Sequence, residues 1–315
     1  MSDGERVLLT GGAGYIGCIL VPALLEAGYD VTVLDRFPHA DPGLAACCRY
    51  STFHAVRGDV RDLGLLRRLV AKADIVLPLA ALVGAPLCAR SPNEAVAVNR
   101  DAVRALLSLL SREQRLVFPT TNSGYGSGLA AEYCTEESPL RPVSLYGTSK
   151  VEAEAAVLER GDGVSLRLAT VFGMSPRMRL DLLVNDFTHR AVTDRTVVLF
   201  EGHFKRNYIH VRDIAAAFLH TLANYGAMSG RAYNVGLSDA NLSKLELCAK
   251  IKEQVPDFVY LEAPIGEDPD RRNYIVSNER IERTGWRPNW TLERGIAELV
   301  KGFEMLNNAR FGNVA

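Results

Sequence analysis

The chain lacks a surplus of basic charge, a long apolar run and any low-complexity tract. Among its 315 residues, 36 lysines and arginines stand against 37 aspartates and glutamates, which gives a net charge of −1. A nucleic-acid-binding protein normally carries a basic surplus, so this balance argues against nucleic acid as a partner. No uncharged apolar stretch approaches the roughly 18 residues that cross a bilayer, so no membrane span is expected.

The cysteines and histidines also lack the spacing of a metal site. No two cysteines form a C-x-x-C pair, and no histidines cluster near them. Reduced thiols in a cytoplasmic protein are the simplest interpretation. The polar first residues lead into an apolar strand without the basic start and apolar run of a secretory signal, which fits the same location. The cysteines are Cys18, Cys47, Cys48, Cys88, Cys134 and Cys248.

Short apolar runs alternate with longer helical stretches in the first half of the chain. A helix is expected to end near Gly28, and others over 93–111 and 144–160. This alternation implies a parallel sheet covered on both faces, so the fold class is α/β with a doubly wound sheet. The expected strands are 7–9, 31–35, 53–56, 75–79, 116–118 and 164–168.

The pattern loosens after about residue 174, where a loop is expected over 174–180. We predict that residues 1–174 form a large cofactor-binding lobe and residues 175–315 mostly a smaller substrate-binding lobe. The helix over 211–223 is expected to pack back against the first lobe. The expected helices are 181–193, 211–223, 242–253 and 291–306, and short strands lie near 196–200 and 257–261.

A glycine-rich turn follows the first strand. Gly11, Gly14 and Gly17 are spaced G-x-x-G-x-x-G and open a helix. Glycines let the backbone approach a pyrophosphate, and the helix start offers free N–H groups, as in Rossmann-type dinucleotide sites. Asp35, at the end of the second strand, can accept hydrogen bonds from ribose hydroxyls and favours NAD, whereas Arg36 beside it could serve NADP. The alternative is a tight turn without a ligand.

Tyr146 and Lys150 stand four residues apart, so they share one face of the helix over 144–160. At neutral pH only about one free tyrosine in a thousand is ionised. A nearby ammonium and a positively charged nicotinamide can lower the phenol pKa and make it a base for an alcohol proton. Taken alone, the two residues could equally form a surface pair. Their position after a dinucleotide-binding turn favours catalysis.

Further motifs follow in order along nearly the whole chain. Together with the two above, they resemble the extended short-chain dehydrogenase/reductases, in the branch of nucleotide-sugar epimerases and dehydratases. The resemblance implies an NAD-dependent enzyme with a Rossmann-type sheet, a smaller C-terminal lobe and a nucleotide-diphosphate sugar as substrate. The motifs are Asp35, Asp59, 79–81, Asn99, 120–126, Arg167, 206–213, 233–236 and 285–288.

The resemblance also implies individual roles. Thr121 hydrogen-bonds the substrate oxygen beside Tyr146, and Lys150 holds the nicotinamide ribose and tunes Tyr146. Arg206 and the pair 271–272 grip the diphosphate with planar guanidinium forks; for 271–272 a solvated charge cluster is the alternative. The cofactor positions are Gly11, Ala13, Gly14, Tyr15, Ile16, Gly17, Asp35, Asp59, Val60, Leu79, Ala80, Ala81, Asn99, Tyr146, Lys150 and Ala169. The substrate positions are Asn122, Ser123, Thr170, Arg179, Asn185, Arg206, Arg271 and Arg272.

Two departures from the family pattern narrow the chemistry. The dehydratases carry Asp-Glu directly after the catalytic threonine, whereas this chain has Asn122 and Ser123, neither of which ionises usefully. Dehydration is therefore disfavoured. Thr170 replaces the family's usual asparagine, so sugar contacts do not transfer directly from hexose epimerases. The stretches 79–88, 175–187 and 266–272 look closest to a subgroup that includes the GDP-D-glycero-α-D-manno-heptose 4-dehydrogenases of capsular heptose pathways.

Three functions stay open. The leading one is oxidation at C4 of a nucleotide-linked heptose or hexose, with release of the ketone. A 4-epimerase would instead turn the ketone and return the hydride to its other face. A non-catalytic NAD-sensing module on the same fold should lack the Thr–Tyr–Lys set.

The resemblance further implies a homodimer built from the helices near 93–111 and 144–160. Apolar positions on these helices are candidates for its interface, and the alternative is that they face only the sheet. These positions are Ala102, Leu106, Leu109, Ala153, Ala156 and Val157.

Overall fold

The computed structural model describes residues 4–38, 43–127, 132–264 and 272–306, and its centre is a seven-stranded sheet. All neighbouring strands of this sheet are parallel, in the order β11-β7-β5-β4-β1-β2-β3. The strands are β1 (Arg6–Thr10), β2 (Asp30–Asp35), β3 (Phe53–Arg57), β4 (Ile75–Pro78), β5 (Arg115–Thr121), β7 (Val164–Leu168) and β11 (Ala232–Val235).

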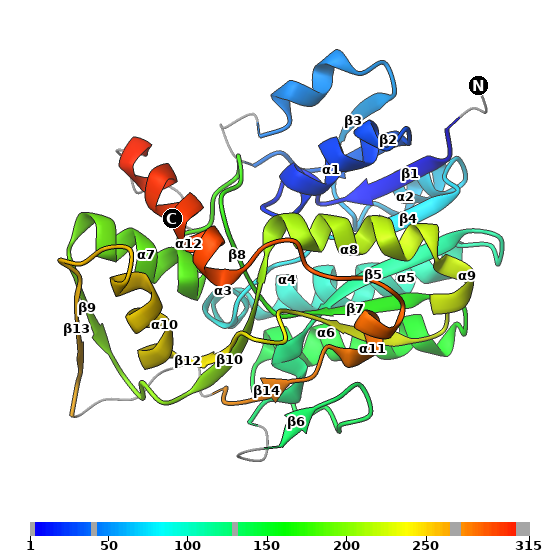
Figure 1. Cartoon of the computed structure of the whole chain (residues 1–315). Coiled ribbons are helices and arrows are strands. Elements are labelled where there is room, and N and C mark those ends of the chain that lie inside the picture. Colours follow the sequence, from blue (N-terminus) through cyan, green and yellow to red (C-terminus); the bar gives the residue numbers. More distant parts are fainter. Residues whose placement is uncertain (1–3, 39–42, 128–131, 265–271, 307–315) are drawn as a thin grey trace.

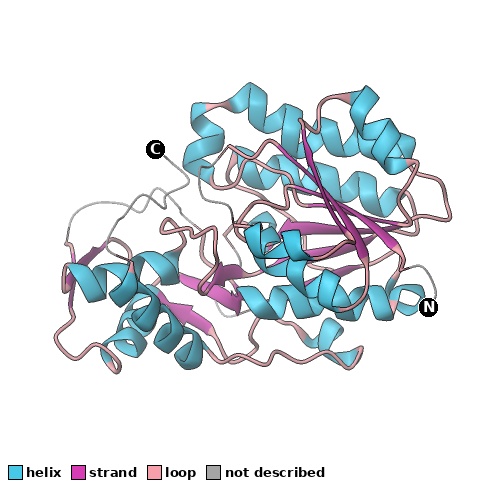
Figure 2. Ribbon diagram, turned by 90° about the horizontal axis from the view of Figure 1, so that it is seen from above, coloured by secondary structure: helices cyan, strands magenta, loops and turns pink. Residues whose placement is uncertain are grey.

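Helices cover both faces of the sheet, as Figure 2 shows from above. Along β1, Val7 and Leu9 point into one core with α1 (Gly17–Glu26) and α8 (Val211–Ala223), while Leu8 points into the other. That second core is closed by α2 (Leu63–Val70), α5 (Ala102–Leu109) and α6 (Leu145–Glu159). Because successive side chains of a strand point to opposite faces of the sheet, each face packs against its own layer of helices. The predicted doubly wound α/β fold is confirmed.

Most of the apolar positions proposed for a dimer interface are used within the monomer. Leu106, Ala153 and Val157 belong to the second core, Leu109 packs against it, and Ala102 is also buried. These positions are therefore no evidence for an interface, because helical periodicity does not tell a core-facing stripe from a partner-facing one. Ala156 is partly exposed, and the dimer stays a prediction. The helix expected over 93–111 is divided into α4 (Pro92–Val96), a π-helical turn (Ala97–Asp101) and α5.

The second part of the molecule contains smaller sheets and three longer helices, α7 (Leu183–Thr193), α10 (Lys244–Lys252) and α12 (Leu292–Met305). These helices pack on one another, and α7 contacts both of the others. Strands β8 (Thr170–Phe172), β10 (Lys205–His210) and β12 (Asn241–Ser243) form one sheet. The paired strands are β9 (Thr196–Leu199) with β13 (Val259–Glu262), and β6 (Tyr133–Cys134) with β14 (Ile275–Val276).

The chain passes from β7 of the large sheet directly into β8 of the three-stranded sheet. Helix α8 packs on α1. Strand β11, which was not predicted from the sequence, adds an edge strand beside β7. A lobe boundary at 174 stays a prediction. The remaining helices are η1 (Ala45–Arg49), α3 (Ala85–Arg90), η3 (Asn122–Tyr125), α9 (Tyr225–Met228) and α11 (Glu279–Arg283).

No helix within the described ranges has the length and apolar character to cross a bilayer. Within the same ranges, no group of three or more histidine, cysteine, aspartate or glutamate side chains is arranged to hold a metal ion.

Candidate active site

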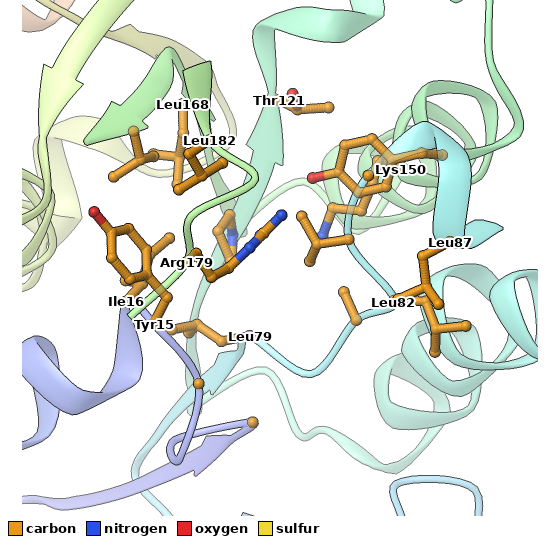
Figure 3. A pocket seen from close by; sticks show the side chains of 18 of the residues that line it. Tyr15, Ile16, Leu79, Leu82, Leu87, Thr121, Lys150, Leu168, Arg179 and Leu182 are labelled. Atoms are coloured by element: carbon orange, nitrogen blue, oxygen red, sulfur yellow. The ribbon is translucent and has the colours of Figure 1, made fainter. Parts of the chain in front are cut away.

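The carboxyl ends of the parallel strands open into a cavity of about 1010 Å³. Its walls come from the turn after β1, the ends of β2 to β5, the start of α6 and the segments around β8 and β10. Figure 3 shows side chains from several of these elements around the opening, among them Thr121, Lys150 and Arg179. Ligands of doubly wound sheets bind at this edge.

The glycine turn is shaped for a backbone that approaches a ligand closely. Gly11 has φ +74, and a Cβ built on it would lie 2.6 Å from Ala80. A Cβ on Gly17, where α1 begins, would lie 2.3 Å from the Gly12 carbonyl oxygen. Side chains are therefore excluded at both positions, and the N–H groups at the start of α1 face the cavity edge that would receive a pyrophosphate.

Asp35 ties the glycine turn to the end of β2. Its carboxylate accepts hydrogen bonds from the N–H groups of Ala13 (2.9 Å) and Phe37 (2.8 Å). The guanidinium of Arg36 is turned toward Glu94, with an Nη1–Oε1 distance of 2.9 Å. Glu94 thus engages Arg36, and contact of Asp35 with the ribose stays a prediction.

Asp59 and Val60 line the same end of the cavity. A hydrogen bond from the Arg61 side chain is the main reason why the pKa of Asp59 falls to about 2. The Asp59 carboxylate is therefore ionised at any physiological pH and acts as an acceptor.

Helix α6 brings Tyr146 and Lys150 to the cavity. Ser144 caps the helix by accepting the Gly147 N–H at 3.2 Å. The Lys150 side chain is buried, and its Nζ lies 4.0 Å from the centre of the Phe118 ring. Burial lowers the pKa of Lys150 to about 7, although the nearby Glu154 carboxylate acts in the opposite direction. The lysine is thus poised between its charged and neutral forms near neutral pH.

The phenol of Tyr146 has a raised pKa in this structure. Burial is the largest cause, and the charges of Arg179 and Arg272 together with a hydrogen bond to Thr121 work against it. The Thr121 hydroxyl also donates to the Ser123 hydroxyl at 2.9 Å, at the end of β5. Threonine, tyrosine and lysine therefore converge on one cavity, as the resemblance implied.

The cationic part of the site lies toward the second lobe. Thr170 and Ser123 line the cavity together with the predicted cations, and the Arg272 guanidinium donates to the Ser123 hydroxyl. Lys244, at the start of α10, was not predicted; its Nζ donates to the Phe200 carbonyl at 2.7 Å. No sequence motif marks it. The cations that line this part are Arg179, Arg190, Arg206, Lys244 and Arg272.

Three predicted asparagines lie behind the cavity wall and do not line it. The Asn99 amide accepts the Leu82 N–H at 2.8 Å and donates to the Leu82 carbonyl at 2.9 Å, so it fixes the loop after β4. Asn122 is fully buried, and neither end of its amide has a hydrogen-bond partner among the described residues.

Asn185 is also fully buried and supports the wall. Its amide accepts the Gly173 N–H at 3.0 Å and donates to the Arg179 carbonyl at 2.9 Å and the Tyr15 hydroxyl at 3.2 Å. In this structure Asn99 and Asn185 support the cavity wall, and contact of the three asparagines with a bound ligand stays a prediction. Arg271 lies outside the described residues, and all the other predicted site residues line the cavity.

Comparison with known proteins identifies the family. The model of the NAD dependent epimerase/dehydratase family matches residues 7–236. The chain belongs to this family. It is accordingly an enzyme, and NAD is its cofactor, as predicted.

The family's relatives match along nearly their full length. The chain is 31% identical to the low-salt glycan biosynthesis protein Agl12 of Haloferax volcanii, over 93% of this chain and 97% of that protein. It is 30% identical to a dTDP-glucose 4,6-dehydratase of Streptomyces niveus, over 95% and 92%. The solved structure of a Thermus thermophilus UDP-glucose 4-epimerase in complex with NAD is 27% identical, with a TM-score of 0.81, and covers 96% of this chain and 99% of that one.

Proposed function

We propose that this enzyme oxidises C4 of a nucleotide-linked sugar, and that it is a GDP-heptose 4-dehydrogenase that makes sugars for a surface or capsular polysaccharide. One observation carries the proposal: Thr121, Tyr146 and Lys150 meet at the cavity that the glycine turn also lines. The heptose and the guanine base are supported only by the resemblance of 79–88, 175–187 and 266–272.

The residues present fit NAD. The turn at Gly11 and Gly17 would hold the pyrophosphate, Asp35 the adenosine ribose and Lys150 the nicotinamide ribose. When bound, NAD supplies the acceptor for the hydride that leaves C4. The residues of the chain transfer the proton of the substrate hydroxyl.

Tyr146 accepts the proton of the C4 hydroxyl on its phenol oxygen. The Thr121 hydroxyl, which already interacts with that phenol, hydrogen-bonds the same substrate oxygen and fixes its direction. Lys150 is buried and Tyr146 is half-buried, which limits the access of water to the transfer.

The nucleotide-sugar class is supported by the cations at the other end of the cavity. Arg206 and Lys244 are buried, and together with Arg272 they surround the space next to the catalytic residues. Buried cations of this kind suit a diphosphate. The relatives named for dTDP-glucose and UDP-glucose point to the same class.

Incubation with NAD and a panel of nucleotide sugars, with products read by mass, tests the proposal. A 4-dehydrogenase gives a product lighter by two hydrogens and an equal amount of NADH. A 4-epimerase, the alternative favoured by the likeness to the Thermus thermophilus enzyme, gives an isomer of unchanged mass and no net NADH. Turnover of no member of the panel would contradict both.

We also propose a homodimer in the cytoplasm. The resemblance supports the dimer, and the six free thiols fit a reducing compartment. The apolar positions named from the sequence do not support it. Light scattering at micromolar concentration distinguishes dimer from monomer, and a monomer would contradict the proposal.

A further inference from the structure

The loop between β8 and α7 carries an arginine that enters the cavity. The Asn185 amide bonds to the Gly173 N–H and to the Arg179 carbonyl, so it holds both ends of this loop. The Tyr15 hydroxyl donates to the Gly173 carbonyl at 2.5 Å and joins the same loop to the glycine turn. The backbone of Arg179 is therefore fixed to both lobes before any ligand binds.

The Arg179 side chain reaches across the cavity. It is only 9% exposed, and its Nε and Nη2 both donate to the Asp181 carboxylate, at 3.0 and 2.5 Å. Its Nη2 lies 4.0 Å from the position that a Cβ on Gly84 would take, at the start of α3. Figure 3 shows the guanidinium pointing into the middle of the cavity, toward the side where Lys150 lies. Its charge is thus brought from the second lobe to the catalytic end of the first.

We propose that Arg179 is a positioning residue that stabilises the phenolate of Tyr146 across the cavity, as a second cation beside Lys150. The inference deepens the proposed function and rests on Tyr146 acting as the base. The resemblance implies only that Arg179 contacts the substrate, whereas this inference assigns it an effect on the ionisation of Tyr146.

The charged groups around the phenol support this assignment. After burial, the Arg179 charge is the largest influence on the Tyr146 pKa, and it favours the phenolate. Asp181 offsets part of that charge, but its side chain is 33% exposed against 11% for Arg179, so solvent screens it more. The groups that act on the Tyr146 phenol are Cys88 on α3, Thr121 on β5, Arg179 on the loop and Arg272 before β14. Lys150 and Asp181 line the same cavity.

A lysine alone is a weak source of permanent charge here. Because burial brings the pKa of Lys150 to about 7, a large share of it is neutral at physiological pH in this structure. A guanidinium stays charged across the whole working range. Arg179 therefore supplies a charge that does not vanish when the lysine loses its proton.

The test compares Arg179→Met and Arg179→Lys with the wild type. Arg190→Met is the matched control, because Arg190 lines the same cavity but pairs with Asp186 at 2.7 Å and is not among the charges that act on Tyr146. For each NAD-loaded protein, the ultraviolet phenolate signal is measured against pH and corrected with the matching Tyr146→Phe variant. The difference reports Tyr146 alone, whether or not a substrate is known.

We expect Arg179→Met to raise the apparent pKa of Tyr146 by roughly one unit, which means about tenfold less phenolate at a given pH below it. Arg179→Lys should restore much of the loss below the lysine pKa, and Arg190→Met should leave the titration unchanged. In Arg179→Met the pH at which kcat rises should move upward by the same amount, measured with the sugar that the panel identifies.

An unchanged Tyr146 titration in Arg179→Met, with KM alone raised, would overturn the inference and leave Arg179 as a substrate contact. If Arg179→Met fails to fold, Arg179→Gln and Arg179→Lys decide by the same titration. Failure of the whole sugar panel would count against the proposed function, yet the phenolate titration would still decide the role of Arg179.

Discussion

At the scale of a single residue, removing the phenol oxygen of Tyr146 tests proton transfer separately from cofactor binding. Tyr146→Phe keeps the ring that packs at the start of α6 but removes the proton acceptor. We expect kcat to fall by at least about 10²-fold, the usual contribution of a general base, while NAD affinity stays near its wild-type value. Steady-state kinetics and calorimetric titration with NAD measure the two quantities.

Lys150→Met is the matched comparison for that variant, because Lys150 is expected to touch the nicotinamide ribose as well as to tune the phenol. It should weaken NAD binding and lower kcat together. Substantial turnover by Tyr146→Phe would remove Tyr146 from its role as base.

Asp35 is expected to set the preference for NAD over NADP. Asp35→Ala removes both the ribose acceptor and the bonds to the N–H groups of Ala13 and Phe37, so NAD should bind more weakly and the discrimination should narrow. Binding constants for both cofactors measure the effect. Arg36→Ala is the control and should leave NAD affinity nearly unchanged, because Glu94 engages Arg36. A wild type that binds NADP more tightly would show that Arg36 dominates.

Sequence reasoning predicted the reactive side chains better than the supporting ones. Tyr146 and Lys150 were placed in the cavity because helical spacing fixes their common face. The sequence did not show that Asn99 and Asn185 bond the backbone of the wall, because an amide can bond a ligand or a neighbouring backbone equally well. Lys244 was not predicted as a site residue because no sequence motif marks the start of its helix.

At the scale of secondary-structure elements, Glu298 joins helix α12 to the rest of the molecule. Its carboxylate accepts hydrogen bonds from the Met174 N–H at 3.0 Å and from Arg212 at 3.0 Å, and pairs with the ring of His210 at 2.8 Å. Burial opposes the ionisation of Glu298, but these partners outweigh it and hold the pKa at about 2.

Because its pKa is lower in the folded state than in the unfolded chain, Glu298 stabilises the fold above about pH 4.3, the ordinary glutamate value. That contribution is lost as the pH falls toward 2. Glu298→Gln should cost up to about 3 kcal/mol at neutral pH and roughly half as much at pH 3. Urea unfolding at both values measures it. Glu293→Gln on the same helix is the control: its side chain is 48% exposed, so it should change stability by less than about 1 kcal/mol at either pH.

Strand β11 shows why part of the fold could not be predicted from the sequence. Its four residues are all buried, and they pair with β7, more than sixty residues earlier in the chain. A short apolar run of this length fits a strand or a buried turn of helix equally well, and nothing local states which sheet it joins. The longer elements of the second lobe, such as α7 and α12, were predicted within two residues because their apolar periodicity is local.

At the scale of the whole molecule, the oxidation site lies beside two positions, Asn122 and Ser123, that carry no ionisable acid–base pair. A dehydratase must take a proton from C5 and give one to the departing C6 hydroxyl. In this chain Ser123 stands at one of the two positions and is engaged by Thr121 and Arg272, while Asn122 at the other is fully buried behind the wall. Neither an amide nor an unassisted serine acts as a base near neutral pH.

We therefore expect the enzyme to oxidise its sugar without removing water. The product should be a 4-keto sugar lighter by two hydrogens, or an isomer if the hydride returns, and mass spectrometry of the reaction distinguishes them. Deuterium from the solvent should not enter C5, because neither Asn122 nor Ser123 can exchange that proton near neutral pH. The Streptomyces niveus dehydratase, the relative whose name states a dehydration, is the positive control for water loss under the same conditions. A product lighter by one water would contradict the argument and would require an acid–base pair elsewhere on the cavity wall, where Asp181 and Asp186 are carboxylates to test.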